Sequence, residues 1–158
     1  MKTILVLVLA GMFATTASAA LFDTRAQIEA KYGSPVQSKN PMKGSDESIL
    51  YKKDSLNVQV EYIKGRAMRM AYWIVGHKLT KTEAFELMKA STENSSNWNE
   101  KSSKTVIRWE RSDHRAKAGL DRNGGSLWIA STDWLAAAAA KKKQDLGGGG
   151  AMESTRKK

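Results

Sequence analysis

The sequence predicts an antiparallel α+β domain preceded by an export signal. Apolar and polar residues alternate in two separate regions of the chain, which is the pattern of half-buried strands. Each region follows a short segment with helix-start chemistry, and the turns between its strands are so short that neighbouring strands must be antiparallel. We therefore expect a helix, a three-strand antiparallel meander, a second helix, a second three-strand antiparallel meander and a C-terminal helix. The repeated order also suggests a pseudo-duplication.

Residues 1–19 have the three parts of a cleavable secretory signal peptide. Lys2 precedes an apolar run from Ile4 to Ala10, and Ala17-Ser18-Ala19 supplies the small-x-small pattern that signal peptidase accepts. Polar residues end the apolar run well short of the about 20 residues that a membrane anchor needs. We expect cleavage before Ala20, export to the periplasm or the medium, and no transmembrane segment after cleavage.

The 158-residue chain contains no cysteine and has a formal net charge of +10. Without cysteine it has no acceptor for a lipid anchor and no disulfides, so its core has to be stable by itself. We expect a single domain over residues 20–143, followed by a flexible glycine-rich linker and basic tail over 144–158. Within residues 20–140, positive and negative residues are interspersed along the sequence, and the excess of positive charge lies largely in residues 141–158.

The first helix is predicted to extend from Arg25 to Tyr32. Thr24 and Gln27 have the spacing of a capping box, in which each side chain bonds the other residue's backbone N–H at a helix start. Gly33 can adopt the left-handed conformation that ends a helix, and Pro35 prevents the helix from continuing.

The first meander is predicted over residues 48–75, after a loop at 40–47. The alternation of apolar and polar residues is clearest in 56–62. Turns at 54–55 and 64–65 divide this region into three strands.

The second helix is predicted to begin after Thr80 and to end near Ser91. Thr80 and Glu83 repeat the capping-box spacing, and Leu79 is placed to pack on Ala84. Apolar residues recur at intervals of three and four, so this helix has one narrow apolar face that can lie on a sheet.

The second meander is predicted in three short strands at 105–109, 114–120 and 126–130, after a polar loop at 92–103. Asn123-Gly124, between the last two strands, is a strong signal for a two-residue type I′ turn, because glycine adopts positive φ without a side-chain clash.

The C-terminal helix is predicted to begin at Ser131 or Thr132, either of which can cap it. It should continue through the alanines at 136–140 to Lys141–Lys143, where cations suit the helix dipole. Gly147–Gly150 then predict a flexible linker, and the last eight residues are expected to be disordered.

The first helix ends in Tyr32-Gly33-Ser34-Pro35 and leads into an antiparallel meander. In this respect the chain resembles the group of small exported domains that includes the barrel-assembly accessory lipoprotein and beta-lactamase inhibitory protein. The resemblance implies a helix-and-sheet unit, present as a tandem pair in the second of these proteins, and a function in protein binding. It transfers no interface residue, because the matching residues only end the helix.

The sequence has no recognised catalytic, cofactor-binding or metal-binding motif, so we expect no enzyme activity, no cofactor and no metal. His77 and His114 lie beside turns and lack metal-ligand spacing. Glu110, Asp113 and Asp121 lie close in sequence but have arginine neighbours, which favours surface ion pairs. A small hydrolase that uses such carboxylates on cell-envelope polymers is the alternative.

Tryptophan gives the strongest binding signal, because this residue is enriched at binding hot spots. The candidate binding surface comprises Trp73, Trp98, Trp109 and Trp128, for which packing in the core is the alternative interpretation. Candidate contacts to anionic polymers are Lys141, Lys142, Lys143, Arg156, Lys157 and Lys158. We predict an exported, non-catalytic module that binds an envelope or extracellular protein. Its tail would make weak contact with anionic polymers, and it would not recognise nucleic acid specifically.

The first prediction concerns processing of the chain. Protein recovered from the periplasm or the medium is expected to have the intact mass of a chain that begins at Ala20. A mass that retains residues 1–19, or protein found only in the cytoplasm, would contradict export by this signal.

Overall fold

The computed structural model describes residues 20–92 and 97–147. The predicted signal peptide at 1–19 lies outside these residues, as do residues 148–158 with Arg156, Lys157 and Lys158. The helices are α1 (Arg25–Tyr32), α2 (Lys81–Ala90) and α3 (Thr132–Gly147). The strands are β1 (Gln37–Lys39), β2 (Glu47–Lys53), β3 (Leu56–Ile63), β4 (Arg66–Ile74), β5 (Trp98–Ser102), β6 (Val106–Arg111), β7 (Ala116–Asp121) and β8 (Leu127–Ser131).

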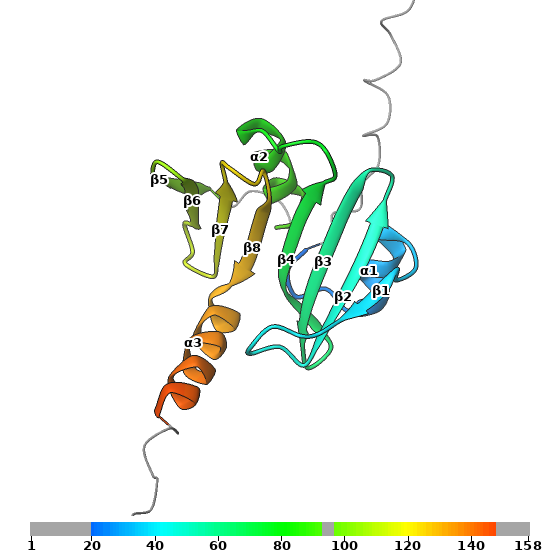
Figure 1. Ribbon diagram of the computed structural model, residues 1–158, viewed down its shortest axis with the longest axis vertical. Helices are drawn as coiled ribbons and strands as arrows, with labels where there is room; N and C mark the ends of the chain where they lie inside the picture. Colours follow the sequence, from blue (N-terminus) through cyan, green and yellow to red (C-terminus); the bar gives the residue numbers. More distant parts are fainter. Residues whose placement is uncertain (1–19, 93–96, 148–158) are drawn as a thin grey trace, which may run out of the picture.

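The described strands form one antiparallel sheet with the order β1-β2-β3-β4-β8-β7-β6-β5. Each half of the chain contributes a helix and then a four-strand meander, and the last strands of the two meanders, β4 and β8, pair at the centre (Figure 1). The predicted α+β class and the two antiparallel meanders are therefore confirmed, and both belong to a single sheet.

The prediction of three strands in each meander was wrong, because each has a fourth strand at the edge of the sheet. Strand β5 occupies part of the region predicted as a polar loop and pairs with β6 along its length. Strand β1 is short and fully exposed. Neither strand has an alternating apolar pattern strong enough to be seen in sequence, because an edge strand is held mainly by backbone pairing with its neighbour.

Both predicted capping boxes are present. The backbone N–H of Thr24 donates to Gln27 Oε1 and that of Thr80 to Glu83 Oε2, each at 2.8 Å. At the start of α3, the backbone N–H of Trp134 donates to the hydroxyl of Ser131 at 3.1 Å, so Ser131 is the residue that caps this helix. Helix α3 continues past the expected end at Lys143 to Gly147. Among the described residues, no helix combines the length and the hydropathy that a membrane span requires.

The main core lies between the sheet and helices α1 and α2. Ile28 of α1 and Ala84 and Met88 of α2 are fully buried against strand residues from both halves of the sheet. Two hydroxyl groups are buried with them as a pair, Tyr51 and Tyr62, with their oxygens 2.9 Å apart. The core is thus shared by the two meanders, so neither half has a complete core of its own.

Helix α3 belongs to a second, smaller cluster on the opposite side of the sheet. Trp134 of α3 packs with Met68 and Ala130, and its indole N–H donates to the hydroxyl of Ser45 at 2.8 Å. The loop that contains Ser45 is so close to α3 that a Cβ atom on Gly44 would lie 2.9 Å from the backbone nitrogen of Ala138. This loop and α3 together cover one end of the second face of the sheet.

The turn between β7 and β8 differs from the prediction. Gly124 does not have positive φ, whereas Gly125 does, with φ of 64°. The backbone N–H of Asp121 donates to the carbonyl of Ser126 at 3.0 Å, so residues 122–125 form a four-residue loop in place of the two-residue type I′ turn.

A tertiary contact explains why Gly125 takes the special conformation. A Cβ atom at this position would lie 2.4 Å from the Cα of Lys78, and the Gly125 carbonyl accepts a hydrogen bond from the backbone N–H of Leu79 at 3.2 Å. Such a close approach of two backbones leaves room only for glycine. Sequence patterns within the hairpin carry no information about this contact.

The second prediction compares these two glycines. Gly125→Ala is expected to lower the free energy of unfolding by roughly 2 kcal/mol or more, because it adds left-handed strain to a backbone clash. Gly124→Ala should cost less, since its new methyl group meets only the side chain of Asp121. Urea denaturation of both variants measures the difference, and equal losses would show that the contact with Lys78 does not determine the turn.

Candidate functional site

The face of the sheet opposite α1 and α2 is the candidate binding face, and we call it the open face. Figure 1 views the sheet from this side, with α1 and α2 behind it. Strand register aligns the side chains of this face in rows across the sheet. The central row contains Gln59, Ala71, Trp128, Gly119, Arg108 and Lys101. The next row contains Ser48, Glu61, Arg69, Ala130, Lys117 and Glu110.

Trp128 forms an aromatic platform at the centre of the open face. Its neighbours in the row are the two small residues Ala71 and Gly119. A Cβ atom on Gly119 would lie 2.6 to 2.7 Å from three indole atoms, so the ring lies face-on against the backbone at Gly119. The small neighbours therefore let the indole lie flat on the sheet, where it is partly buried and also packs against the cluster of Met68, Ala130 and Trp134.

The four candidate tryptophans are divided between the two faces. Trp73 shares the open face with Trp128, since it lies two residues beyond Ala71 on β4, and both tryptophans are half-buried. Trp109 is only 2% exposed and belongs to the main core, and Trp98 packs against that core from β5. Only Trp73 and Trp128 are retained in the candidate surface.

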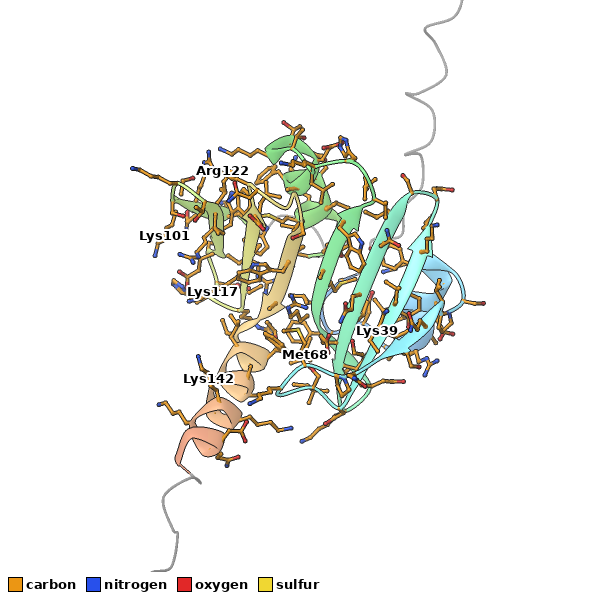
Figure 2. All side chains as sticks on the ribbon, viewed as in Figure 1. Lys39, Met68, Lys101, Lys117, Arg122 and Lys142 are labelled. Carbon is orange, nitrogen blue, oxygen red and sulfur yellow. The ribbon has the colours of Figure 1, made fainter. Side chains whose placement is uncertain are left out.

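Basic side chains adjoin the platform on strands β5, β6 and β7. Arg108 and Lys101 continue the central row beyond Gly119, and Lys117 lies in the next row. All three are exposed, and Figure 2 shows Lys101 and Lys117 near the end of the sheet that β5, β6 and β7 form. On the described parts of β5, β6 and β7, Glu110 is the one acidic residue in these two rows, while Glu61 lies at the other end on β3. The open face therefore carries a basic region, which we define as Lys101, Arg108 and Lys117.

The basic region was not predicted from the sequence, because its residues are interspersed with acidic residues along the chain. The three basic residues come from three different strands, and only the register of those strands brings them together. The expectation that positive charge lies largely in the tail was therefore incomplete. Lys141–Lys143, the described part of the predicted polyanion contact, are exposed on α3.

Glu110 is already engaged by three cationic or ionisable partners. His114 Nδ1 lies 3.1 Å from Glu110 Oε1, and the Nζ atoms of Lys101 and Lys117 lie 3.6 Å from its two oxygens. The hydrogen bond from His114, followed by the charges of Lys117 and Lys101, lowers the pKa of the Glu110 carboxyl. Glu110 is thus ionised at neutral pH and partly offsets the two lysines. No described acid forms an ion pair with Arg108.

At its other end the open face is closed by the loop that packs on α3. Glu61 is fully buried there, where its carboxylate accepts hydrogen bonds from the hydroxyl of Ser48 at 2.8 Å, the amide of Gln59 at 2.9 Å and the backbone N–H of Met42 at 3.1 Å. Neighbouring Arg69 stacks on Trp134, with its Cζ 5.4 Å from the ring centroid. Burial lowers the pKa of the Arg69 guanidinium. This end of the face is a satisfied structural network, which leaves the region around Trp128 and Arg108 for a ligand.

The histidines and the remaining carboxylates are found in separate local pairs. His77 Nε2 lies 3.1 Å from Glu83 Oε1, whereas His114 pairs with Glu110. In the described part of the chain, no three His, Asp or Glu side chains come together in a way that could hold a metal ion.

Asp113 lies in the turn between β6 and β7, and Asp121 is the last residue of β7. Asp113 accepts two hydrogen bonds from the guanidinium of Arg111, at 2.7 and 2.6 Å, and this contact lowers the pKa of its carboxyl to about 2. Asp121 accepts the backbone N–H of Asn123 at 2.9 Å. A carboxyl group with a pKa this low is ionised at neutral pH and does not suit the role of a general acid.

No protein-family model and no curated protein matches this sequence. Among solved structures, an extracellular protein containing a SCP domain from Bacillus anthracis str. Ames is similar, with a TM-score of 0.50 and 13% identity over 84% of this chain and 52% of that chain. A cysteine-rich secretory protein from Staphylococcus aureus subsp. aureus Mu50 has a TM-score of 0.43 and 11% identity over 73% of this chain and 46% of that chain. This chain thus spans about half of each. At such identity the first similarity concerns the fold alone.

The first of these structures corrects the resemblance drawn from the sequence. The group that includes the barrel-assembly accessory lipoprotein and beta-lactamase inhibitory protein was the wrong comparison, because the solved structure that shares the fold is the extracellular protein with a SCP domain. A helix that ends in glycine and proline before a meander is a local feature, and it does not specify how a whole domain is arranged.

The third prediction tests the platform. Gly119→Val is expected to push the indole of Trp128 off the sheet and to lower the free energy of unfolding by roughly 1 to 3 kcal/mol, the usual cost of overpacking. In a Trp128→Ala background the same substitution should cost much less, because the clashing ring is gone. A double-mutant cycle of unfolding free energies measures this coupling, and additive effects would show that the ring does not lie on Gly119.

Proposed function

We propose that this chain is an exported, non-catalytic module that binds an anionic polysaccharide of the cell envelope through the open face. The observation that carries the proposal is the alignment of Trp128, Arg108 and Lys101 in one row across neighbouring strands. An aromatic ring beside unpaired or partly paired cations is a surface that a monomeric domain does not need for its own stability.

The chemistry of the row fits a charged sugar chain. The flat outer side of an indole stacks on the C–H groups of a pyranose ring, while arginine and lysine pair with carboxylate, sulfate or phosphate groups. Trp128 and Arg108 are two strands apart, which corresponds to about 10 Å, and Lys101 is one strand further. About 10 Å is the length of a disaccharide, so one sugar chain lying across the strands can contact all three side chains.

Export places such a module among envelope polymers. The support for export is the signal-peptide pattern at residues 1–19, together with the extracellular nature of the solved protein that shares the fold. The protein partner expected from sequence, an envelope or extracellular protein, is a second kind of ligand that the same face could take if it carries acidic groups.

No observation favours the alternative function, a hydrolase of envelope polymers. Its carboxylates, Glu110, Asp113 and Asp121, are bound to basic side chains or to backbone N–H groups of turns. Lowered pKa values keep Glu110 and Asp113 ionised, so neither suits the protonated partner that a glycosidase pair requires.

The fourth prediction uses heparin as the anionic probe. The chain from Ala20 should bind a heparin oligosaccharide, and Lys101→Ser with Arg108→Ser should weaken this binding by about tenfold at low salt, since two charge-assisted contacts are lost. Trp128→Leu should also weaken binding, although the net charge is unchanged. Lys53→Ser with Lys89→Ser is the matched control, because it removes two exposed charges outside the open face and should have a much smaller effect.

Heparin binding by a chain that ends at Ala140 distinguishes binding through the open face from binding through residues 141–158. Retention of the heparin affinity by this chain supports the proposal, whereas loss of affinity would place the binding in residues 141–158. Stronger binding to single-stranded DNA of equal charge than to heparin would identify a nucleic-acid surface and overturn the polysaccharide proposal. Equal binding by the wild type and the Trp128→Leu variant would also overturn the role of the aromatic platform.

A further inference from the structure

The first described residues are buried and hydrogen-bonded, although they lie directly after the predicted cleavage position. Ala20 is 3% and Leu21 is 5% exposed. The backbone N–H of Leu21 donates to the carbonyl of Ser91 at 3.0 Å, beyond the end of α2, and that of Phe22 donates to the carbonyl of Ala67 in β4 at 2.6 Å. The domain therefore uses its chain from residue 20 onward.

A buried carboxylate faces the backbone nitrogen of Ala20. Asp23 is 7% exposed, and its Oδ2 accepts a hydrogen bond from the Ala20 nitrogen at 2.8 Å. The same oxygen accepts the ammonium group of Lys31 at 2.8 Å. One carboxylate oxygen thus receives donors from the first described residue and from the last turn of α1.

We propose that the α-ammonium group created by cleavage before Ala20 occupies this site as a second cation on the Asp23 carboxylate, and so couples processing of the chain to the stability of the fold. The inference rests on the export part of the proposed function, not on the ligand of the open face. It assigns a structural role to a group that exists only in the processed protein.

The processing step changes the charge at this nitrogen. A signal peptidase hydrolyses the Ala19–Ala20 peptide bond with one water molecule, whose hydroxyl goes to the carbonyl of Ala19 and whose proton goes to the nitrogen of Ala20. At neutral pH the new amine takes a further proton from solvent. A neutral amide donor therefore becomes a cation within hydrogen-bond distance of Asp23. Charge-assisted hydrogen bonds are about twice as strong as neutral ones, and a carboxylate removed from water gains most from them.

Asp23 bonds this nitrogen directly, and the other titratable or charged groups known around the site act on Asp23 or on the adjoining backbone. Lys31 pairs with Asp23, the hydroxyls of Tyr32 and Tyr72 interact with its charge, and Arg66 donates to the carbonyl of Phe22. Burial raises the pKa values of the Tyr32 and Tyr72 hydroxyls, so both stay neutral well above pH 8. The α-amine, with an ordinary pKa of about 7.7 to 8.0, is therefore the local group that changes charge between about pH 7 and pH 9.

The direction of the pH effect follows from this pairing. Asp23 favours the ammonium form in the folded state, so the pKa of the α-amine is raised above its value in the unfolded chain. The resulting stabilisation is fully present below about pH 7.7 and is lost as the pH rises through the higher folded-state value.

The fifth prediction compares two forms of the chain that begins at Ala20, one with a free α-amine and one acetylated at that nitrogen. Acetylation restores a neutral amide like that of the uncleaved chain. The acetylated form is expected to have a Tm about 2 to 4 °C lower near pH 7, the shift that a net gain of one charged hydrogen bond gives in a domain of this size. The difference should vanish by about pH 10.

Variants of Asp23 test whether its carboxylate is the group that binds the α-amine. In Asp23→Asn the two forms should have the same Tm, whereas Asp54→Asn, an exposed carboxylate in the turn between β2 and β3, should leave the difference intact. Equal Tm values for the two wild-type forms near pH 7 would overturn the proposal even if Asp23→Asn failed to fold. A difference that persists above pH 10 or in Asp23→Asn would also overturn it. A site-specific protease can generate the chain that begins at Ala20 without any export. A negative result in this Tm comparison is therefore distinct from a failure of export or of polysaccharide binding.

Discussion

The pairing of β4 with β8 is the interaction on which the rest of the structure depends. These strands are the last of their meanders, and their register, with Met70 opposite Ile129 and Ala71 opposite Trp128, joins two four-stranded units into one sheet. Met70 and Ile129 are fully buried in the main core, which draws side chains from both halves. The same register places Trp128 between Ala71 and Gly119. Core and candidate binding face are therefore fixed by a single strand pairing, and a shift of one residue would exchange the two faces of β8.

The two faces of this single sheet are covered by different elements and to different extents. Helices α1 and α2 bury the apolar side, whereas the other side is only partly covered, by α3 and the loop around Ser45. The buried carboxylate of Glu61 belongs to that partial cover, because it binds the loop backbone at Met42. A charge buried with three hydrogen-bond donors adds little net stability, but it favours one position of the loop over others. The loop and α3 thus limit the open face to the region around Trp128.

The sequence predicted those features that depend on neighbours along the chain. Both capping boxes, the alternation within the central strands and the antiparallel order follow from local chemistry, as does the opposite orientation of Trp109 and Arg108 on one strand. Contacts between distant segments could not be predicted in this way. The edge strand β5 needs β6 to pair with, and Gly125 needs the backbone of Lys78 against it. The basic region was hidden for the same reason, because Lys101, Arg108 and Lys117 are neighbours only across strands.

The N-terminal segment makes long-range contacts from the first described residues onward. Residues 21 and 22 bond to Ser91 after α2 and to Ala67 in β4, so they join the helix of the second half to a strand of the first. Such a segment cannot be trimmed without leaving buried backbone groups unpaired, which costs about 1 to 3 kcal/mol for each group. The signal pattern ends where these bonds start, at Ala20, so a cleavage even two residues later would remove both the donor to Asp23 and the donor to Ser91. The fold therefore uses every residue from Ala20 onward, so a chain shortened beyond this point would lose bonds that its core requires.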